Sequence, residues 1–223
     1  MKIYSILAHP NQGSLNTELF DLANRHFKKN GHKVKTFDLY RSTDKLINAA
    51  TTLTQSDKSM VDRKHMSTYT HNYTMVQYEP LADSFAKDEI KKLKEADLLF
   101  IQTPIFVWSM PAMLKLYIEN VFLYNELFAL TDSWSDKNFK IDKFMTDKKI
   151  LFSITTGSSQ GMTKSVLGST NALTQPIRSM FEFVGYEWVD PYITWSTTKS
   201  RDICDEYLVN FDNYLKEVTW ILK

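Results

Sequence analysis

Residues 97–122 read DLLFIQTPIFVWSMPAMLKLYIENVF, and this stretch decides the fold. Its first six residues, 97–102, form an almost continuous apolar run, which is typical of a strand at the centre of a parallel sheet. A loop over 103–109 follows, and Pro111 is expected in the first turn of a helix that runs through Phe122, where a missing N–H costs little. The expected apolar stripe of that helix is Met110, Leu114, Tyr117, Ile118, Val121 and Phe122.

The same alternation of strand and helix patterns extends towards both ends of the chain. Apolar periodicity predicts strands at 2–8, 33–39, 149–155 and 187–194, and helices at 15–30, 88–96, 165–184 and 198–222. Five strands alternating with helices predict an α/β fold with one doubly wound parallel sheet in three layers. The flavodoxin-like strand order is the natural choice, and ligands then bind beyond the carboxyl ends of the strands.

Residues 41–86 interrupt this pattern. They are rich in Ser, Thr, Asp, Asn, Lys and Tyr and have no sustained period. A structureless loop of this length is uncommon in a compact domain. We interpret the segment as a functional excursion or dimer arm with short helical turns, inserted into a single domain over 1–223. A partly disordered insertion is the alternative.

Composition excludes several classes of protein. The chain has 223 residues, 27 Lys and Arg against 26 Asp and Glu, and a single cysteine, Cys204. The near-zero net charge argues against nucleic-acid binding, and one cysteine excludes a disulfide framework and fits the reducing cytoplasm. The histidines have no metal-site spacing, and no apolar run approaches the roughly 18 residues of a membrane span. The first residues predict a strand rather than a secretory signal.

The first loop, residues 9–16 (HPNQGSLN), joins the first strand to the first helix. Ser14 or Asn16 is expected to cap that helix, whose free N–H groups and dipole then form an anion site. Gly13 permits a tight turn, and His9 is a candidate donor to a phosphate. An ordinary capped helix, with His9 as a turn residue, explains the same residues equally well. The glycine patterns of dinucleotide-binding and P-loop proteins are absent from the sequence.

Two further loops follow predicted strands. The second loop, residues 102–111 (QTPIFVWSMP), carries the aromatic Phe106 and Trp108, which suit a flat apolar ligand such as a flavin ring. Burial of these side chains against a partner subunit is the alternative, and the two interpretations are compatible. The third loop, residues 155–162 (TTGSSQGM), offers N–H and O–H donors to a ring or a phosphate. A flexible connector is the alternative there.

Together the three loops resemble the NAD(P)H:quinone reductase family of flavodoxin-like flavoproteins, which includes DT-diaphorase. The resemblance is carried by LAHPNQGSLN at 7–16, FIQTPIFVWSMPAMLKLYIENVF at 100–122 and SITTGSSQGM at 153–162. The order and spacing match across most of the chain, and the middle stretch is the most specific. The segment after the second strand looks like the one that approaches the adenine half of FAD in the mammalian enzyme.

The resemblance implies a flavin-dependent NAD(P)H oxidoreductase, similar to an NAD(P)H dehydrogenase (quinone). NAD(P)H would pass a hydride to flavin N5 and leave, and a quinone or similar planar acceptor would take its place. This ping-pong hypothesis requires no catalytic side chain, because the cofactor carries the chemistry. The implied cofactor is FAD, with FMN as the alternative. The expected assembly is a homodimer with the active site at the interface.

The resemblance also assigns site residues. Those expected to hold the flavin are His9, Ser14, Leu15, Asn16, Pro104, Ile105, Phe106, Val107, Trp108, Thr155, Thr156, Gly157 and Ser158. Ala129 and Leu130 match a substrate-contacting segment that the partner chain supplies, and Glu119 matches an acid near the pocket. The family's tyrosine after the third motif is Thr163 here, and its nearby histidine has no counterpart between Lys164 and Asn171.

Two other functions remain open from the sequence. One is an electron-transfer flavoprotein, although the balanced charge lacks the strongly acidic face of such proteins. The other is a flavin-binding regulatory subunit of a potassium efflux transporter, which some bacterial relatives of the family provide.

Overall fold

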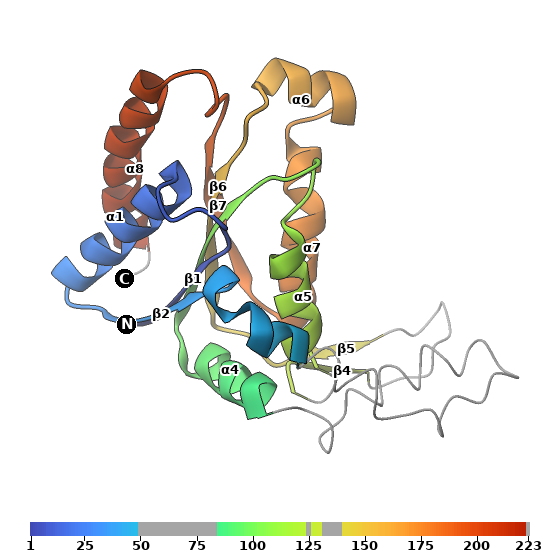
Figure 1. Ribbon diagram of the computed structural model, residues 1–223. Coiled ribbons are helices and arrows are strands. Elements are labelled where there is room, and N and C mark those ends of the chain that lie inside the picture. Colours follow the sequence, from blue (N-terminus) through green and yellow to red (C-terminus); the bar gives the residue numbers. More distant parts are fainter. Residues whose placement is uncertain (49–83, 124–125, 131–139, 222–223) are drawn as a thin grey trace, which may run out of the picture.

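Five parallel strands form the central sheet in the order β2-β1-β3-β6-β7 (Figure 1). The computed structural model describes residues 1–48, 84–123, 126–130 and 140–221. The strands of the sheet are β1 (Lys2–Leu7), β2 (Lys33–Asp38), β3 (Leu98–Pro104), β6 (Lys149–Thr155) and β7 (Glu187–Thr194). This arrangement confirms the predicted flavodoxin-like, doubly wound architecture.

Helices cover both faces of the sheet (Figure 1). Their bounds are α1 (Leu15–Lys29), α4 (Ser84–Glu95), α5 (Ala112–Val121), α6 (Gln160–Leu167), α7 (Gln175–Val184) and α8 (Arg201–Ile221), with 3-10 turns η1 (Tyr40–Ser42) and η2 (Asn171–Leu173). Helices α1 and α8 pack on one face around Phe27, Phe100 and Phe211. Helices α4, α5 and α7 pack on the other face around residues such as Tyr117 and Phe181. The predicted three layers are therefore present.

Strand register brings the carboxyl ends of the strands to one edge. Leu7 at the end of β1 pairs with Gln102 of β3, and Pro104 at the end of β3 pairs with Thr155 at the end of β6. Thr155 in turn pairs with Thr194 of β7. The loops that follow β1, β3 and β6 therefore leave the sheet side by side, as topology predicts for a ligand site.

Several predicted boundaries were wrong. The helix expected over 165–184 is divided into α6, η2 and α7, because Gly168 takes a left-handed φ of 79° that ends α6. The Ser159 hydroxyl caps the Met162 N–H at 3.1 Å, so α6 begins inside the expected third loop. Strand β3 extends to Pro104, and Pro111 is the N-cap of α5 rather than a residue of its first turn.

A two-stranded antiparallel ladder of β4 (Phe128–Leu130) and β5 (Ile141–Lys143) was not predicted. Strands of three residues are too short to show a period of two. Most of the 41–86 segment lies outside the described residues. At its two ends, residues 43–48 are helical and α4 begins at Ser84.

Candidate functional site

The first loop is organised around the His9 ring. The backbone N–H of Asn11 donates to His9 Nδ1 at 3.1 Å, and Ser14 Oγ lies 2.9 Å from the same nitrogen. The Asn11 carbonyl oxygen also lies 3.0 Å from Nδ1, so the tautomer of the ring decides whether this nitrogen donates or accepts. These contacts hold the His9 ring at the start of α1, where it is a candidate hydrogen-bond partner for a ligand.

Ser14 caps helix α1, as one of the two alternatives predicted. Its hydroxyl accepts the Thr17 N–H at 3.3 Å, which leaves the N–H groups of Leu15 and Asn16 at the first two helical positions. Those two positions have no acceptor within an α-helix. Together with the helix dipole they favour an anionic group at this end of α1.

The Asn16 side chain lies beneath the first loop, not in it. It is 5% exposed, and its Nδ2 donates to Thr155 Oγ1 at 2.8 Å. Its Oδ1 accepts from Gln102 Nε2 at 2.9 Å. The carboxamide therefore joins α1 to β3 and β6. Only the backbone of Asn16 remains for the anion site that the sequence assigned to it.

The second loop has an unusual backbone. Phe106 and Ser109 exchange backbone hydrogen bonds of 2.8 and 3.0 Å around Val107 and Trp108, whose φ angles are 50° and 63°. Such a turn normally requires Asn-Gly, because φ is positive at both central positions. Val107 is also 94% exposed and Phe106 40% exposed. An apolar, strained tip thus projects from the carboxyl edge of the sheet.

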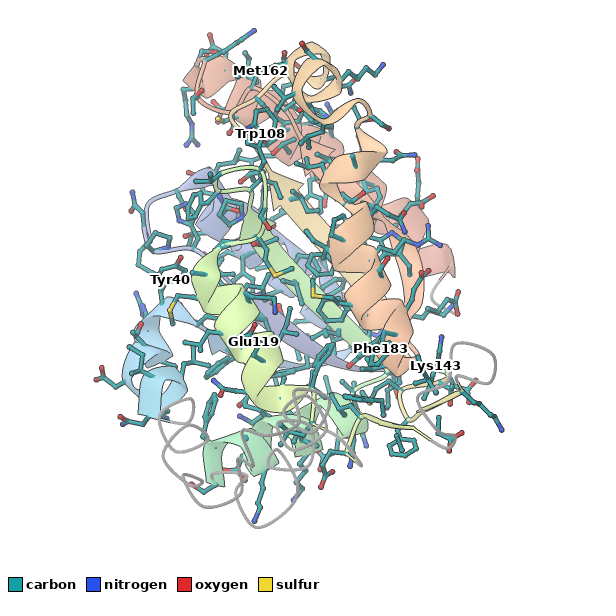
Figure 2. The ribbon with its side chains drawn as sticks, turned by 90° about the vertical axis from the view of Figure 1, so that its right-hand side faces the viewer. Tyr40, Trp108, Glu119, Lys143, Met162 and Phe183 are labelled. Atoms are coloured by element: carbon teal, nitrogen blue, oxygen red, sulfur yellow. The ribbon has the colours of Figure 1, made fainter. Side chains whose placement is uncertain are left out.

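A cavity of about 780 Å³ opens beside this turn. Its walls come from the second loop, the start of α5 and the η2–α7 segment. Figure 2 shows Trp108 above the first turn of α5 and Tyr40 beside that turn. The residues that line it are Tyr40, Phe106, Val107, Trp108, Ser109, Met110, Ala112, Lys115, Leu173, Pro176, Ile177 and Met180. Such an apolar chamber with few polar groups suits a planar organic molecule.

Tyr40 and the α7 side chains of this cavity were missed by the sequence interpretation. Tyr40 follows the carboxyl end of β2, and that position alone was a usable signal. Burial raises the pKa of the Tyr40 phenol, so it remains a neutral donor at physiological pH. Ile177 and Met180 lie on a helix far along the chain, and only the tertiary structure brings them to the second loop.

The third loop presents small hydroxyl residues. Thr156 Oγ1 and Ser158 Oγ lie 2.9 Å apart, and Ser158 Oγ lies 3.0 Å from Thr163 Oγ1 of α6. Thr155 is 3% exposed and bonded to Asn16, whereas Gly157 is exposed at the tip. The hydroxyls therefore belong to an internal network rather than to a flexible connector.

Direct contacts join the three loops. The Ile105 N–H donates to the Thr155 carbonyl at 2.8 Å, which ties the second loop to the third. The His9 and Phe106 rings are tilted at 50° with centroids 6.2 Å apart, which brings the first loop to the second. The structure thus brings together the predicted residues of all three loops, although the side chains of Pro104, Thr155 and Thr156 are buried.

Ala129 and Leu130 lie elsewhere. They belong to β4, which Figure 1 places at the end of the molecule remote from α6 and the third loop. The ring centroids of the neighbouring Phe128 and of Phe183 in α7 lie 4.9 Å apart. Figure 2 shows Phe183 far below Trp108. Glu119 also lies away from the loops, paired with Lys115 at 2.5 Å on the surface of α5. None of these three residues meets the loops within one chain.

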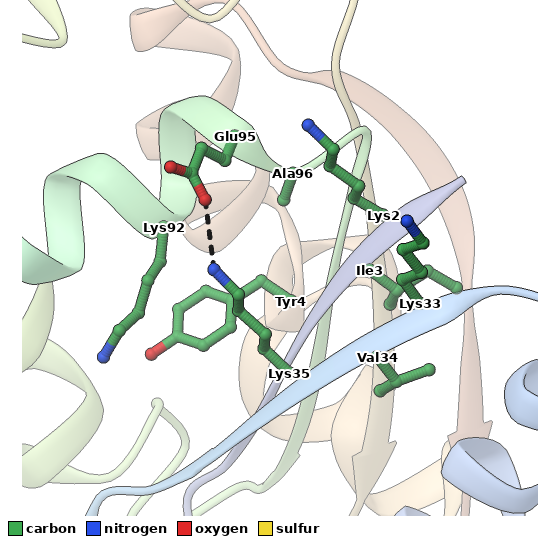
Figure 3. A pocket seen from close by; sticks show the side chains of 9 residues that line it. All are labelled: Lys2, Ile3, Tyr4, Lys33, Val34, Lys35, Lys92, Glu95 and Ala96. Atoms are coloured by element: carbon green, nitrogen blue, oxygen red, sulfur yellow. Dashed lines mark hydrogen bonds and ion pairs between the residues drawn. The ribbon is translucent and has the colours of Figure 1, made fainter.

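A smaller pocket of about 170 Å³ lies at the opposite edge of the sheet, where β1 and β2 begin beside α4 (Figure 3). Lysines surround it, but Lys35 pairs with Glu95 at 3.0 Å, and Lys92 pairs with the buried Glu89. The Glu89 carboxylate also accepts from the Tyr4 and Tyr117 hydroxyls. These charges hold α4 on β1 and β2, so we assign the pocket a structural role.

The described residues contain neither a metal-binding cluster nor a membrane-spanning helix. No cluster of three or more His, Cys, Asp or Glu side chains there is arranged to hold a metal ion. In the same part of the chain, no helix combines the length and apolar character that crossing a bilayer requires.

Comparison with known proteins identifies the family. A model of the family with a flavodoxin-like fold matches residues 1–215. NAD(P)H dehydrogenase (quinone) 1 of Rattus norvegicus is 28% identical over 194 residues, covering 86% of this chain and 67% of the rat protein. FMN-dependent NADH:quinone oxidoreductase of Hydrogenovibrio crunogenus is 28% identical over 122 residues, or 55% of each chain.

A solved structure agrees with the fold. The NAD(P)H:quinone oxidoreductase from Methanothermobacter marburgensis superposes with a TM-score of 0.69 and 16% identity, covering 98% of both chains. The curated relatives confirm the resemblance to the NAD(P)H:quinone reductases that the three loop motifs indicate. Because the family model matches residues 1–215, nearly the whole chain, this protein belongs to the family with the flavodoxin-like fold.

Proposed function

We propose that this protein is a flavin-dependent NAD(P)H oxidoreductase that reduces a quinone or a similar planar acceptor. The observation that carries the proposal is the meeting of three chemically different loops at one edge of the sheet. Donors at the start of α1, an apolar turn at 105–108 and the hydroxyl-rich third loop are linked by the Ile105–Thr155 and His9–Phe106 contacts. Relatives named as an NAD(P)H dehydrogenase (quinone) and an NADH:quinone oxidoreductase support the same activity.

The residues present fit a flavin nucleotide. The N–H groups of Leu15 and Asn16, with the His9 ring beside them, suit its phosphate. The backbone of Ile105–Trp108 and the exposed Phe106 and Val107 suit the apolar ring, and the Gly157 tip suits a polar edge. The flavin, when bound, supplies two-electron chemistry between nicotinamide and acceptor. The chain then has to orient the ring and keep water from it, which the apolar second loop does.

The choice between FMN and FAD belongs to this proposal. The preference for FAD rests on the 41–86 insertion, most of which lies outside the described residues. The relative from Hydrogenovibrio crunogenus is named as FMN-dependent, which supports FMN. We therefore propose a flavin of either form, and mass spectrometry of the flavin released from the purified protein distinguishes them.

We further propose a homodimer whose active site lies at the interface. Ala129 and Leu130 are at the end of the molecule remote from the loops, so contact with a substrate there requires a second chain. Val107, 94% exposed beside the cavity, is an apolar surface that such a partner would cover. One flavodoxin-like domain over 1–223 and a cytoplasmic location, in keeping with the single buried thiol of Cys204, complete the proposal.

Reconstitution tests the activity. The purified chain is titrated with FMN and with FAD, and oxidation of NADH and NADPH is followed with menadione as acceptor. We expect tight binding of one flavin and acceptor-dependent turnover. A chain that binds neither flavin would refute the proposal. Sedimentation of the loaded protein tests the dimer, because a monomer with full turnover contradicts a shared site.

One pair of variants tests the anion site at α1. Leu15→Pro removes the first N–H at a position where proline fits a helix, and the extended Ser14, with φ −96° and ψ 160°, accepts a following proline. Leu15→Ala loses the same side chain but keeps the N–H. Loss of one charge-assisted hydrogen bond predicts about tenfold weaker flavin binding for Leu15→Pro than for Leu15→Ala. Equal flavin affinities of Leu15→Pro and Leu15→Ala would show that the Leu15 N–H does not bind the flavin.

A further inference from the structure

The hydroxyl groups of the third loop form a chain with one possible direction. Thr163 Oγ1 lies 3.0 Å from the Ser159 carbonyl oxygen, which can only accept, so the single Thr163 hydroxyl proton is committed there. The Ser158 hydroxyl, 3.0 Å from Thr163 Oγ1, must then donate to it. Thr156, 2.9 Å from Ser158 Oγ, must donate to Ser158 in turn.

This direction decides what the loop offers to a ligand. The hydroxyl protons of Thr156 and Ser158 both point into the network, and Thr156 Oγ1 also accepts the Ser158 N–H at 3.2 Å. Neither hydroxyl therefore keeps a proton to offer a ligand, and only the oxygens remain as acceptors. Within the described residues no acceptor lies in bonding distance of the Gly157 N–H, which is the donor at the tip.

Both ends of this hydrogen-bonded series of hydroxyls, Thr163 and Thr156, are held in place by the backbone. Thr163 is 0% exposed, and the Ser159 carbonyl that accepts its hydroxyl also accepts its backbone N–H at 3.0 Å in the first turn of α6. The Thr156 backbone is fixed by hydrogen bonds to Thr194 at the end of β7 and to Thr197 just after it. Thr163 cannot touch a ligand itself, because its side chain is fully buried.

We infer that Thr163 is a positioning residue that locks the Ser158 and Thr156 hydroxyls inwards, so that the third loop meets the flavin with oxygen acceptors and the Gly157 N–H. The inference rests on the proposed function, because it requires a flavin at these loops. Without the Thr163 acceptor, the Ser158 hydroxyl is free to turn outwards as a donor. Hydrogen bonds to a more negative group are stronger, so a new donor favours reduced over oxidised flavin.

The test is the two-electron midpoint potential of the bound flavin. Thr163→Val keeps the shape and removes the hydroxyl, and we expect it to raise the preference for reduced flavin about tenfold, which is about 30 mV. Thr163→Ser restores the hydroxyl and is expected to restore the wild-type potential. A melting temperature recorded for each variant separates this effect from a loss of stability.

A double-mutant cycle tests whether Thr163 affects the flavin potential through Ser158. Ser158→Ala frees the Thr156 hydroxyl and is expected to raise the potential by itself. Adding Thr163→Val to Ser158→Ala should then cause no further change, since Thr163 acts through Ser158. The Ser158→Ala measurement also stands if Thr163→Val does not fold.

The outcomes separate the two proposals. Flavin bound to every variant at one unchanged potential, with only the melting temperature lowered, would overturn the positioning role and leave the proposed function intact. Independent shifts that add in the double variant would also overturn it. Failure of the wild-type chain to bind FMN or FAD would instead refute the proposed function itself.

Discussion

Asn16 and Thr155 are 139 positions apart, yet Asn16 Nδ2 donates to Thr155 Oγ1 at 2.8 Å beneath the carboxyl edge of the sheet. The Asn16 oxygen accepts from Gln102 at 2.9 Å, so one carboxamide ties α1 to both β3 and β6. All three side chains are buried. The start of α1, where we place the anion site, is thereby held at a set distance from the second and third loops.

Asn16→Ala tests this junction. It leaves buried polar groups on Gln102 and Thr155 without a partner, and we expect it to lower the free energy of unfolding by about 2–3 kcal/mol. In a chain of this size that corresponds to a fall of roughly 5–10 °C in melting temperature. Asn213→Ala on the exposed face of α8 is the control and should change stability little. Equal stability of the two variants would contradict the junction's importance.

The turn at the end of α7 gives a second prediction. Gly185 has φ +114°, and a Cβ there would lie 3.0 Å from the Thr146 nitrogen and 3.1 Å from Lys143 Cβ. Gly31, with φ +80°, has no atom within 4 Å of the same position. Gly31→Ala is expected to cost about 1 kcal/mol through its backbone conformation, and Gly185→Ala about 3 kcal/mol through conformation and overpacking. Denaturant unfolding measures both, and similar costs would exclude the steric contribution.

Strain in the second loop gives a third prediction. Val107 combines a φ of 50° with 94% exposure, so it contributes strain and little packing. Val107→Asn suits the left-handed conformation and should raise the free energy of unfolding by about 1 kcal/mol. Val209→Asn is the control, because Val209 is 64% exposed in the regular helix α8. No gain at Val107 relative to this control would show that the turn is unstrained in solution.

Stability should depend on pH through two histidines. Burial lowers the pKa of His26, against the opposing charge of Asp212, and burial with the N-terminal ammonium lowers the pKa of His32. The unfolded chain, with histidine pKa values near about 6.5, then binds more protons than the folded chain below that pH. The contribution of these two histidines to folding stability is therefore fully present above about pH 6.5 and is lost as the pH falls through their lowered folded-state pKa values.

Urea unfolding between pH 7 and pH 5 measures this loss. The double variant His26→Gln with His32→Gln removes both titrations and should flatten the dependence. Carboxylates whose pKa values are lowered by lysines, such as Glu95 and Asp212, titrate at lower pH and do not mimic the effect. An unchanged slope in the double variant would assign the dependence to other groups.

Much of the fold was predictable, because local pattern and topology suffice for it. The strands at 149–155 and 187–194 match their expected bounds, since each is rich in apolar and aromatic residues and lies between polar or glycine-containing segments. The helix over 165–184 was wrong because its apolar period continues through Gly168, whose left-handed φ breaks it. The β4 and β5 strands were missed because three residues carry no usable period.

The sequence predicted which loops form the site, but not which individual side chains face it. Parallel topology alone places the loops after β1, β3 and β6 at one edge. The inward position of Asn16 had a signal, since it precedes the buried Leu19, Phe20 and Ala23 at helical spacing. Tyr40 also had a sequence signal, because it follows the end of β2. The residues of α7 that line the cavity had no such signal, because they are remote in sequence from the second loop.

The amino-acid sequence by itself determined the alternation of strands and helices, the edge at which the loops emerge and the kind of residue that each loop carries. These depend on near neighbours along the chain. Only the tertiary structure decided that Asn16 turns inwards to Thr155 and that Ile177 and Met180 of α7 line the cavity beside the second loop. The reason is that each of these contacts needs a partner whose distance and direction are set by segments remote in the sequence.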